Sequence, residues 1–86
     1  MSYWNYRIIR EYDEEYNNYF YDIHGVHYND EGVIHLWTDH PATPFGSDLE
    51  ELKDDLELYT KAIDKPVLEI IMEEGVERLV EVKENG

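Results

Sequence analysis

The sequence predicts one α+β domain in which a three-stranded antiparallel meander packs against a single amphipathic helix, in the order β-β-β-α. Three observations favour this fold class. Aromatic and β-branched residues alternate with polar ones through residues 3–38, an apolar stripe with a helix-start signal follows residue 46, and 86 residues are too few for two separate cores. We therefore expect a single domain over 1–86, with its core in 3–65 and a C-terminal segment, 66–86, whose fold the sequence leaves open.

The first two strands are expected to form a hairpin. Residues 3–12 alternate aromatic or β-branched residues with polar ones, and 13–18 are acidic and amide-rich, which is typical of a hairpin loop. Residues 19–28 form the second expected strand, although neither of its faces is purely apolar, so the inward face stays open. Gly25 is compatible with a bulge that would swap the two faces beyond it.

A third strand follows a tight turn. Residues 29–32 combine amide, acid and glycine, which predicts the turn, and the apolar residues of 33–38 predict the strand. In a regular strand, Ile34 and Leu36 would share one face and Trp37 would lie on the other. Short turns between the three strands favour an antiparallel meander.

The strongest local signal is the start of a helix. Ser47 is the expected N-cap, and Glu50, three residues later, completes a capping-box pattern. Apolar residues then recur at spacings of three and four, and they predict one buried stripe: Leu49, Leu52, Leu56, Tyr59 and Ile63. Because Pro66 ends the pattern, we expect a helix over 48–64.

The C-terminal segment has two alternative interpretations. An apolar run over 67–72, a turn signal over 73–75 and loose alternation over 76–83 favour a hairpin. A short helix, capped by Asp64 with Pro66 in its first turn, is the alternative. The hairpin is preferred.

The charge of the chain limits its partners. There are 21 acidic and 7 basic residues, and the net charge is −14. Nucleic acids and anionic membranes are therefore not expected as partners, because both bind through Lys and Arg. A basic protein surface would be attracted. The simpler interpretation is that the charge only maintains solubility.

Several kinds of site are not expected. The chain has no cysteine, which excludes disulfides and thiolate chemistry. The sequence has neither a signal-peptide pattern nor an apolar stretch of about 20 residues, so we expect a cytoplasmic protein. No catalytic triad, phosphate loop or paired carboxylates in a cleft can be recognised, so we expect neither an enzyme nor a cofactor.

Four histidines raise the question of a metal site. His24 and His27 would point to opposite faces of a regular strand, whereas His27 and His35 could be cross-strand neighbours; His40 follows the third strand. A metal needs three or four converging ligands, which this spacing does not provide. A metal-dependent enzyme built on these histidines is the least favoured alternative, and no metal is expected.

The remaining candidate site combines tyrosines with carboxylates in the first two strands. A sheet covered by one helix leaves one face open, and tyrosine is favoured at protein interfaces. We therefore predict an aromatic-acidic sheet face that docks a basic protein, formed by Tyr12, Tyr16, Tyr19, Tyr21, Tyr28, Glu14, Glu15 and Asp22. One version of this hypothesis is an inhibitor that mimics nucleic acid. The alternative is a homodimer that buries the same face and has no separate ligand.

Several stretches resemble a family of short uncharacterised bacterial proteins. They are Trp4-Asn5-Tyr6-Arg7, Tyr21-Asp22-Ile23-His24 with Tyr28, Trp37-Thr38 with Pro41, Leu49-Glu50-Glu51-Leu52 and Lys65-Pro66-Val67-Leu68. This resemblance covers about residues 3–68 and implies a discrete domain without an assigned activity. The strand order and the helix at 49–59 are also similar to the HicB-type antitoxin domain, although that domain's loop motif and its DNA-binding module are missing.

Overall fold

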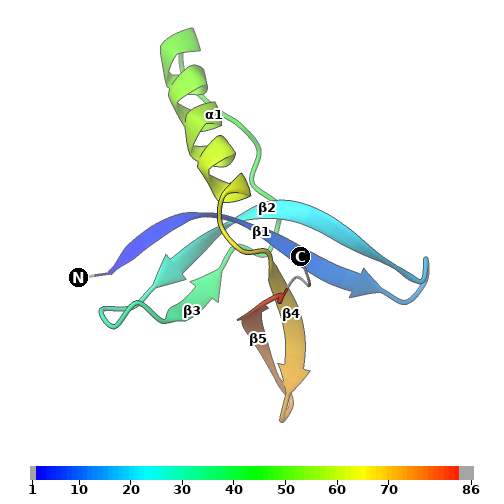
Figure 1. The fold of residues 1–86 in the computed structure, drawn as a ribbon. Coiled ribbons are helices and arrows are strands. Elements are labelled where there is room, and N and C mark those ends of the chain that lie inside the picture. Colours follow the sequence, from blue (N-terminus) through cyan, green and yellow to red (C-terminus); the bar gives the residue numbers. More distant parts are fainter. Residues whose placement is uncertain (1, 84–86) are drawn as a thin grey trace.

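The computed structural model describes residues 2–83, which form one five-stranded sheet and one helix (Figure 1). In chain order the elements are β1 (Tyr3–Asp13), β2 (Asn18–Tyr28), β3 (Ile34–Trp37), α1 (Leu49–Ile63), β4 (Leu68–Glu73) and β5 (Val76–Glu81). The strand order across the sheet is β3-β2-β1-β4-β5. Strands β1 and β4 are parallel, and all other neighbouring strands are antiparallel.

The predicted three-stranded antiparallel meander is therefore wrong, because the sheet is mixed and has five strands. The expected C-terminal hairpin does form, as β4 and β5, and the alternative helix does not form in the described part of this segment. Residues 84–86 of the segment lie outside the described residues. The hairpin is not an appendage of the meander, since β4 pairs with β1 and extends the same sheet.

β1 is the central strand of the sheet, and its sequence shows why. Ile8 and Ile9 are adjacent, so they face opposite sides, and both are at least half-buried. A strand covered on both sides carries consecutive apolar residues instead of a strict alternation. One side of β1 faces α1, and the other side faces the hydrophobic core of the domain.

The register of the strands settles which residues share a side. Pairing of β1 with β2 runs without interruption from Tyr3↔Tyr28 to Asp13↔Asn18, so the sheet has no bulge at Gly25. The irregularity lies between β2 and β3, where His27 pairs with Leu36 and Tyr28 pairs with Ile34. This skips His35 and puts Ile34 on the side opposite Leu36. The expectation that Ile34 and Leu36 share a face is therefore wrong.

The core is small and lies on the side of the sheet away from α1. Its buried members come from three strands: Ile9, Val26, Tyr28 and Leu68. Ile34, Trp37, Ile70 and Leu79 are partly buried against them. β1 contributes Ile9 to this core and β4 contributes Leu68. The parallel pairing of the two strands therefore brings core side chains together.

Helix α1 begins and ends within one residue of the prediction, but its cap differs. Asp48, not Ser47, is the N-cap, and its side chain accepts a hydrogen bond from the Glu51 N–H at 2.8 Å. Glu51, not Glu50, is the third helical residue after this cap, and its carboxylate accepts hydrogen bonds from the side chain and backbone of Ser47, the residue before the N-cap. These hydrogen bonds lower the pKa of Glu51. The sequence pattern fits both registers, and the extended backbone of Asp48 selects the second.

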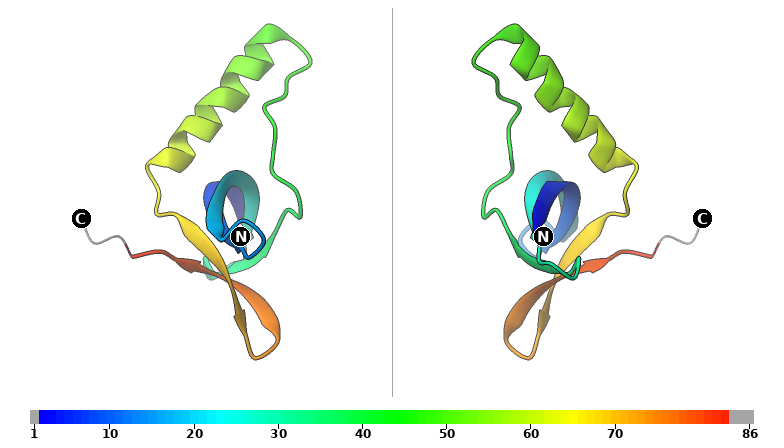
Figure 2. Two further views of the ribbon diagram at one scale, coloured as in Figure 1. Left: turned by 90° about the vertical axis from the view of Figure 1, so that its right-hand side faces the viewer. Right: turned by 90° about the vertical axis from the view of Figure 1, so that its left-hand side faces the viewer.

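The predicted apolar stripe of the helix is only partly buried. Tyr59 and Ala62 are buried, whereas Leu49, Leu56 and Ile63 have exposed fractions of 66%, 44% and 67%. Helix α1 packs on β1 at its C-terminal end, and its N-terminal end points away from the sheet (Figures 1 and 2). Three of the five residues of the predicted stripe therefore stay exposed in the part of the chain that the structure describes.

Two stacked tyrosine rings connect α1 to β1. The rings of Tyr6 and Tyr59 lie 4.2 Å apart and nearly parallel, and the Tyr6 hydroxyl donates to Asp55 Oδ1 at 2.9 Å. Burial and the hydrogen bond to Asp55 raise the pKa of Tyr6, and burial raises the pKa of Tyr59. Both groups therefore resist ionisation in the folded chain.

Stability is expected to fall in alkaline solution because of this pair. A tyrosine whose pKa is higher in the folded chain than in the unfolded chain stabilises the fold as long as its hydroxyl is protonated in both states. This contribution is complete below the ordinary tyrosine pKa of about 10, and it is lost as the pH rises above that value. The free energy of unfolding, measured in urea at several pH values, should therefore decrease above about pH 10. Tyr6→Phe should make this decrease shallower, and equal slopes for the variant and the wild type would contradict the prediction.

Candidate protein-binding surface

The outer parts of β1 and β2 project from the sheet as a two-stranded ribbon (Figure 1). β4 pairs with β1 only at Ile9 and Arg10, and β3 pairs with β2 only from Val26 onward. The turn between the strands is held by Asp13, whose side chain accepts hydrogen bonds from the N–H groups of Glu15 and Tyr16 at 2.9 and 3.2 Å. The loop expected over 13–18 is thus confirmed as a hairpin turn.

Five aromatic side chains lie on this projection. We call residues 11–22 the aromatic ribbon; its rings belong to Tyr12, Tyr16, Tyr19, Phe20 and Tyr21. All are exposed except Tyr19, which is half-buried with the Arg10 guanidinium 4.2 Å from its ring centre. The rings contact one another edge to face, Tyr12 with Tyr19 at 5.3 Å and Tyr16 with Phe20 at 5.8 Å. The rings therefore support each other while their outer surfaces stay in water.

The ribbon is strongly negative. Its carboxylates belong to Glu11, Asp13, Glu14, Glu15 and Asp22, and none of them forms an ion pair within residues 2–83. The neighbouring cation, Arg10, pairs instead with Glu69 of β4 at 2.6 Å. A ligand would therefore meet exposed rings surrounded by carboxylates that lack a positive partner.

Most of the predicted site residues come together here, with one exception. Tyr12, Tyr16, Tyr21, Glu14, Glu15 and Asp22 are exposed on the ribbon, and Tyr19 is half-buried on it. Tyr28 is not part of this surface: it is 5% exposed, stacks on Tyr3 at 4.5 Å and donates to Asn5 Oδ1 at 2.8 Å. The side chain of Tyr28 points to the core side of the sheet, because the uninterrupted register of β1 with β2 pairs Tyr28 with Tyr3. Phe20, which the sequence-based selection omitted, is the apolar ring on the same side of the ribbon as Asp22.

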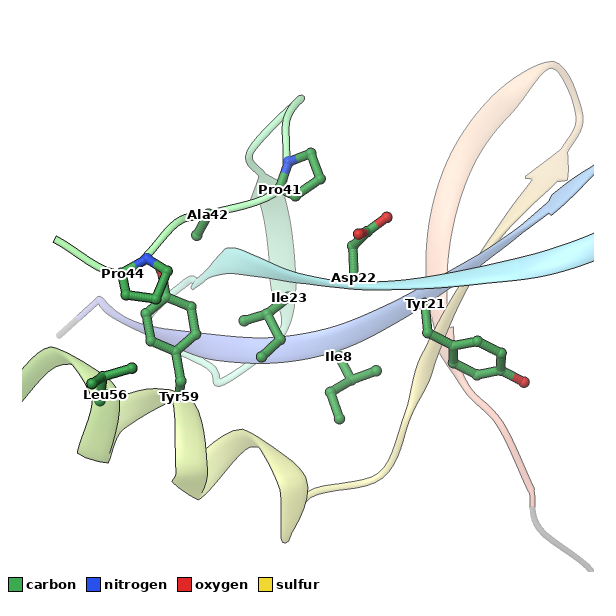
Figure 3. Close-up of a pocket in the computed structure, with 9 residues that line it drawn as sticks. All are labelled: Ile8, Tyr21, Asp22, Ile23, Pro41, Ala42, Pro44, Leu56 and Tyr59. Atoms are coloured by element: carbon green, nitrogen blue, oxygen red, sulfur yellow. The ribbon is translucent and has the colours of Figure 1, made fainter.

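A groove adjoins the ribbon where the sheet, α1 and the connecting segment meet. We call residues 38–46 the strap. The cavity measures about 420 Å³ and is lined by Ile8, Tyr21, Asp22 and Ile23 from the sheet, Pro41, Ala42 and Pro44 from the strap, and Leu56 and Tyr59 from the helix (Figure 3). Tyr21 and Asp22 belong to both the groove and the ribbon, so the two form one continuous surface.

Backbone hydrogen bonds hold the strap over the groove. The Thr38 N–H donates to Gly25 O at 3.0 Å, and the Ala42 N–H donates to Ile23 O at 2.8 Å. At the other end, the Phe45 N–H donates to Asp55 Oδ2 at 2.9 Å. Asp55 therefore binds both the strap and Tyr6, and it fixes the wall of the groove against the sheet.

A buried arginine lies on the opposite side of the sheet. Arg7 is 6% exposed, its terminal nitrogens donate to Tyr28 Oη at 2.9 Å and Pro66 O at 2.8 Å, and its Nε has no hydrogen-bond partner within residues 2–83. No carboxylate of the described residues pairs with it. Arg7 thus ties β1 to the segment before β4, at the expense of burying a charge without a counter-ion.

Removing the charge of Arg7 is expected to change the free energy of unfolding only slightly. Arg7→Met eliminates a buried unpaired charge and loses two hydrogen bonds, so the free energy of unfolding should change by less than about 1 kcal/mol. Tyr28→Phe keeps the charge but removes one of its acceptors, and it should cost about 1–3 kcal/mol. Urea titrations of both variants test this order, and a larger loss for Arg7→Met than for Tyr28→Phe would contradict it.

The histidines do not converge on a metal position. His24 Nδ1 lies 3.0 Å from Thr38 O, on the core side, whereas His27 lies on the α1 side near Trp4. His27 pairs with Leu36 and not with His35, so the cross-strand pair of histidines that the sequence allowed does not form. Within residues 2–83, no three histidine or acidic side chains form a group that could hold a metal ion.

No protein family, curated protein or solved structure matches this chain, so the resemblances described above stay expectations. The helix of the described region is 15 residues long and lacks the length and apolar character needed to cross a bilayer.

Proposed function

We propose that this chain is a protein-binding module that docks a basic protein through the aromatic ribbon. The observation that carries the proposal is a projecting hairpin with exposed rings and carboxylates that have no ion-pair partner within residues 2–83. Tyrosine and phenylalanine are enriched at interfaces, and their rings also bind Lys and Arg by cation–π contact. The role is binding, not catalysis.

The extended shape of the chain supports a role in a complex. Its accessible surface is 6799 Å², whereas a compact monomer of its mass has roughly 5,400 Å². Its radius of gyration is 14.2 Å, against roughly 12 Å for a compact domain of this length. The excess of about 1,400 Å² is larger than the ~800 Å² that one partner contributes to a standard interface.

The net charge of −14 supports a basic partner. Electrostatic attraction speeds encounter and is screened by salt, with a Debye length of about 10 Å at 0.1 M. The partner should therefore bind tightly at low salt and weakly at high salt. One version of the proposal is an inhibitor that mimics nucleic acid, in which case DNA or RNA would compete with this chain for the partner. Simultaneous binding would contradict that version.

The alternative is a homodimer without a separate ligand. It is supported by Leu49, Leu56 and Ile63, which recur every seven residues on α1 and remain exposed. The charge opposes it, because two chains of net charge −14 repel each other. Light scattering distinguishes the two: a monomer at micromolar concentration excludes the homodimer.

Affinity purification from the native cell tests the proposal. The wild-type chain should retain a basic protein that is released by high salt, and the double variant Tyr12→Ser/Tyr16→Ser should retain at least tenfold less. Val33→Ser is the matched control, because Val33 is an exposed apolar residue outside the ribbon. Retention that is independent of salt, or equal for the ribbon variant and the control, would refute the proposal.

A further inference from the structure

We infer that the groove between α1, the strap and the sheet receives apolar side chains from a lysine- or arginine-rich segment of the partner. This inference rests on the proposed function, since it names the chemistry of the partner segment that lies beside the aromatic ribbon. The groove shares Tyr21 and Asp22 with the ribbon, so one partner can contact both.

The lining of the groove suits apolar side chains. Ile8 and Ile23, which are cross-strand neighbours, form the sheet side, and Pro44 and Leu56 lie on the strap and helix sides (Figure 3). A space of about 420 Å³ holds on the order of a dozen waters. Most of the polar atoms that water would need are absent from these side chains. Replacing that water by apolar groups is therefore favourable.

Residues 2–83 leave this space unfilled for a structural reason. The stacked rings of Tyr6 and Tyr59 stand between α1 and β1 and keep the helix backbone away from the sheet. The strap fixes the other side through the hydrogen bonds of Ala42 and Phe45. Leu56, at the wall of the groove, consequently stays 44% exposed.

Charge at the groove selects a cationic segment. Asp22 lies at the edge of the groove, is exposed and has no ion pair within residues 2–83, and its carboxylate points to the opposite side of β2 from Ile8 and Ile23 (Figure 3). The ribbon carboxylates continue from it, and the chain as a whole carries −14. An acidic segment would be repelled, whereas a segment that alternates apolar residues with lysine or arginine would satisfy both the apolar lining and the carboxylates.

Two synthetic peptides of equal length and charge separate the apolar contribution from the electrostatic one. One alternates lysine with leucine, and the other alternates lysine with serine. Fluorescence anisotropy should show that the wild-type chain binds the lysine–leucine peptide at least tenfold more tightly than the lysine–serine peptide. Equal affinities would overturn the inference, because binding would then be electrostatic only.

Groove-filling variants locate the binding. Ala42 points into the groove (Figure 3), so Ala42→Leu should fill it and reduce the tenfold preference to less than twofold. Thr43→Leu, on the same strap but not lining the groove, should keep the preference. Leu56→Ser, with Leu49→Ser as its control on the same helix, repeats the test without adding volume. Thermal unfolding of each variant verifies that it is folded.

The outcomes distinguish the two proposals. A preference unchanged in both Ala42→Leu and Leu56→Ser would overturn the groove inference, while loss of the native partner by the ribbon variant would still support the proposed function. If the ribbon variant keeps the native partner, the proposed function fails, whatever the peptides show. A dimer in light scattering that Ala42→Leu dissociates would assign the groove to a second copy of this chain and overturn the inference.

Discussion

Gly46→Ala is expected to lower the free energy of unfolding by about 3 kcal/mol, the upper part of the range for overpacked positions. A Cβ at this position would lie 2.3 Å from the backbone nitrogen of Leu52 and 2.8 Å from the carbonyl carbon of Glu51. These are backbone atoms of the first turns of α1, so no side-chain rotation relieves the contact. Either the strap moves away from the helix or the start of the helix unwinds.

Urea titration measures this loss, and two other glycines serve as controls. Gly25→Ala would place its Cβ 3.4 Å from Thr38 Cγ2, an ordinary contact, so its cost should be small. Gly32 has open space around it but a φ of +79°, so Gly32→Ala should cost about 1 kcal/mol from backbone strain. A Gly46→Ala variant as stable as Gly25→Ala would show that the strap does not pack on the helix as described.

Leu68→Ala is expected to be the most damaging single substitution of an apolar side chain. Leu68 is 0% exposed and pairs with Ile9 where β4 joins β1. Truncating a buried leucine to alanine costs about 2–5 kcal/mol, and in a domain of this size each kcal/mol lowers Tm by roughly 4–8 °C. Because total stability is typically 5–15 kcal/mol, a large part of it should be lost.

Thermal unfolding of Leu68→Ala and Leu56→Ala provides the comparison. Leu56 is 44% exposed, so truncating it should cost under about 1 kcal/mol. Amide hydrogen exchange adds a local measurement, since β4 and β5 should lose protection in Leu68→Ala before the hairpin of β1 and β2 does. Equal losses of stability in the two variants would contradict the placement of Leu68 in the core.

The elements that the sequence predicted correctly are determined by signals within short stretches of the chain. The turn before Asn18, the helix between Asp48 and Asp64, and the hairpin of β4 and β5 are set by turn formers, caps and periodicity within short windows. The parallel pairing of β1 with β4 has no such local signal, because it joins Ile9 to Leu68 across most of the chain. The neighbouring apolar residues Ile8 and Ile9 were the one available indication of a strand covered on both sides.

The candidate surface was foreseen only in part. The exposure of Tyr12, Tyr16 and Tyr21 follows from having one helix for a sheet with many rings. Tyr28 could not be separated from them, because its burial depends on the register and on the bulge at His35 of β3. The groove depends on how far the Tyr6–Tyr59 stack holds α1 from β1, which no pattern in the sequence specifies.

The pairing limits of β1 and β2 have a consequence for self-association. Outside the segments that pair with β3 and β4, the outer edges of the two ribbon strands pair with no further strand of residues 2–83, and unpaired strand edges are the geometry by which β-proteins polymerise. Five carboxylates on this short stretch impose like-charge repulsion on any second copy that approaches edge to edge. The charges that we propose to attract a basic partner would thus also protect the chain against aggregation.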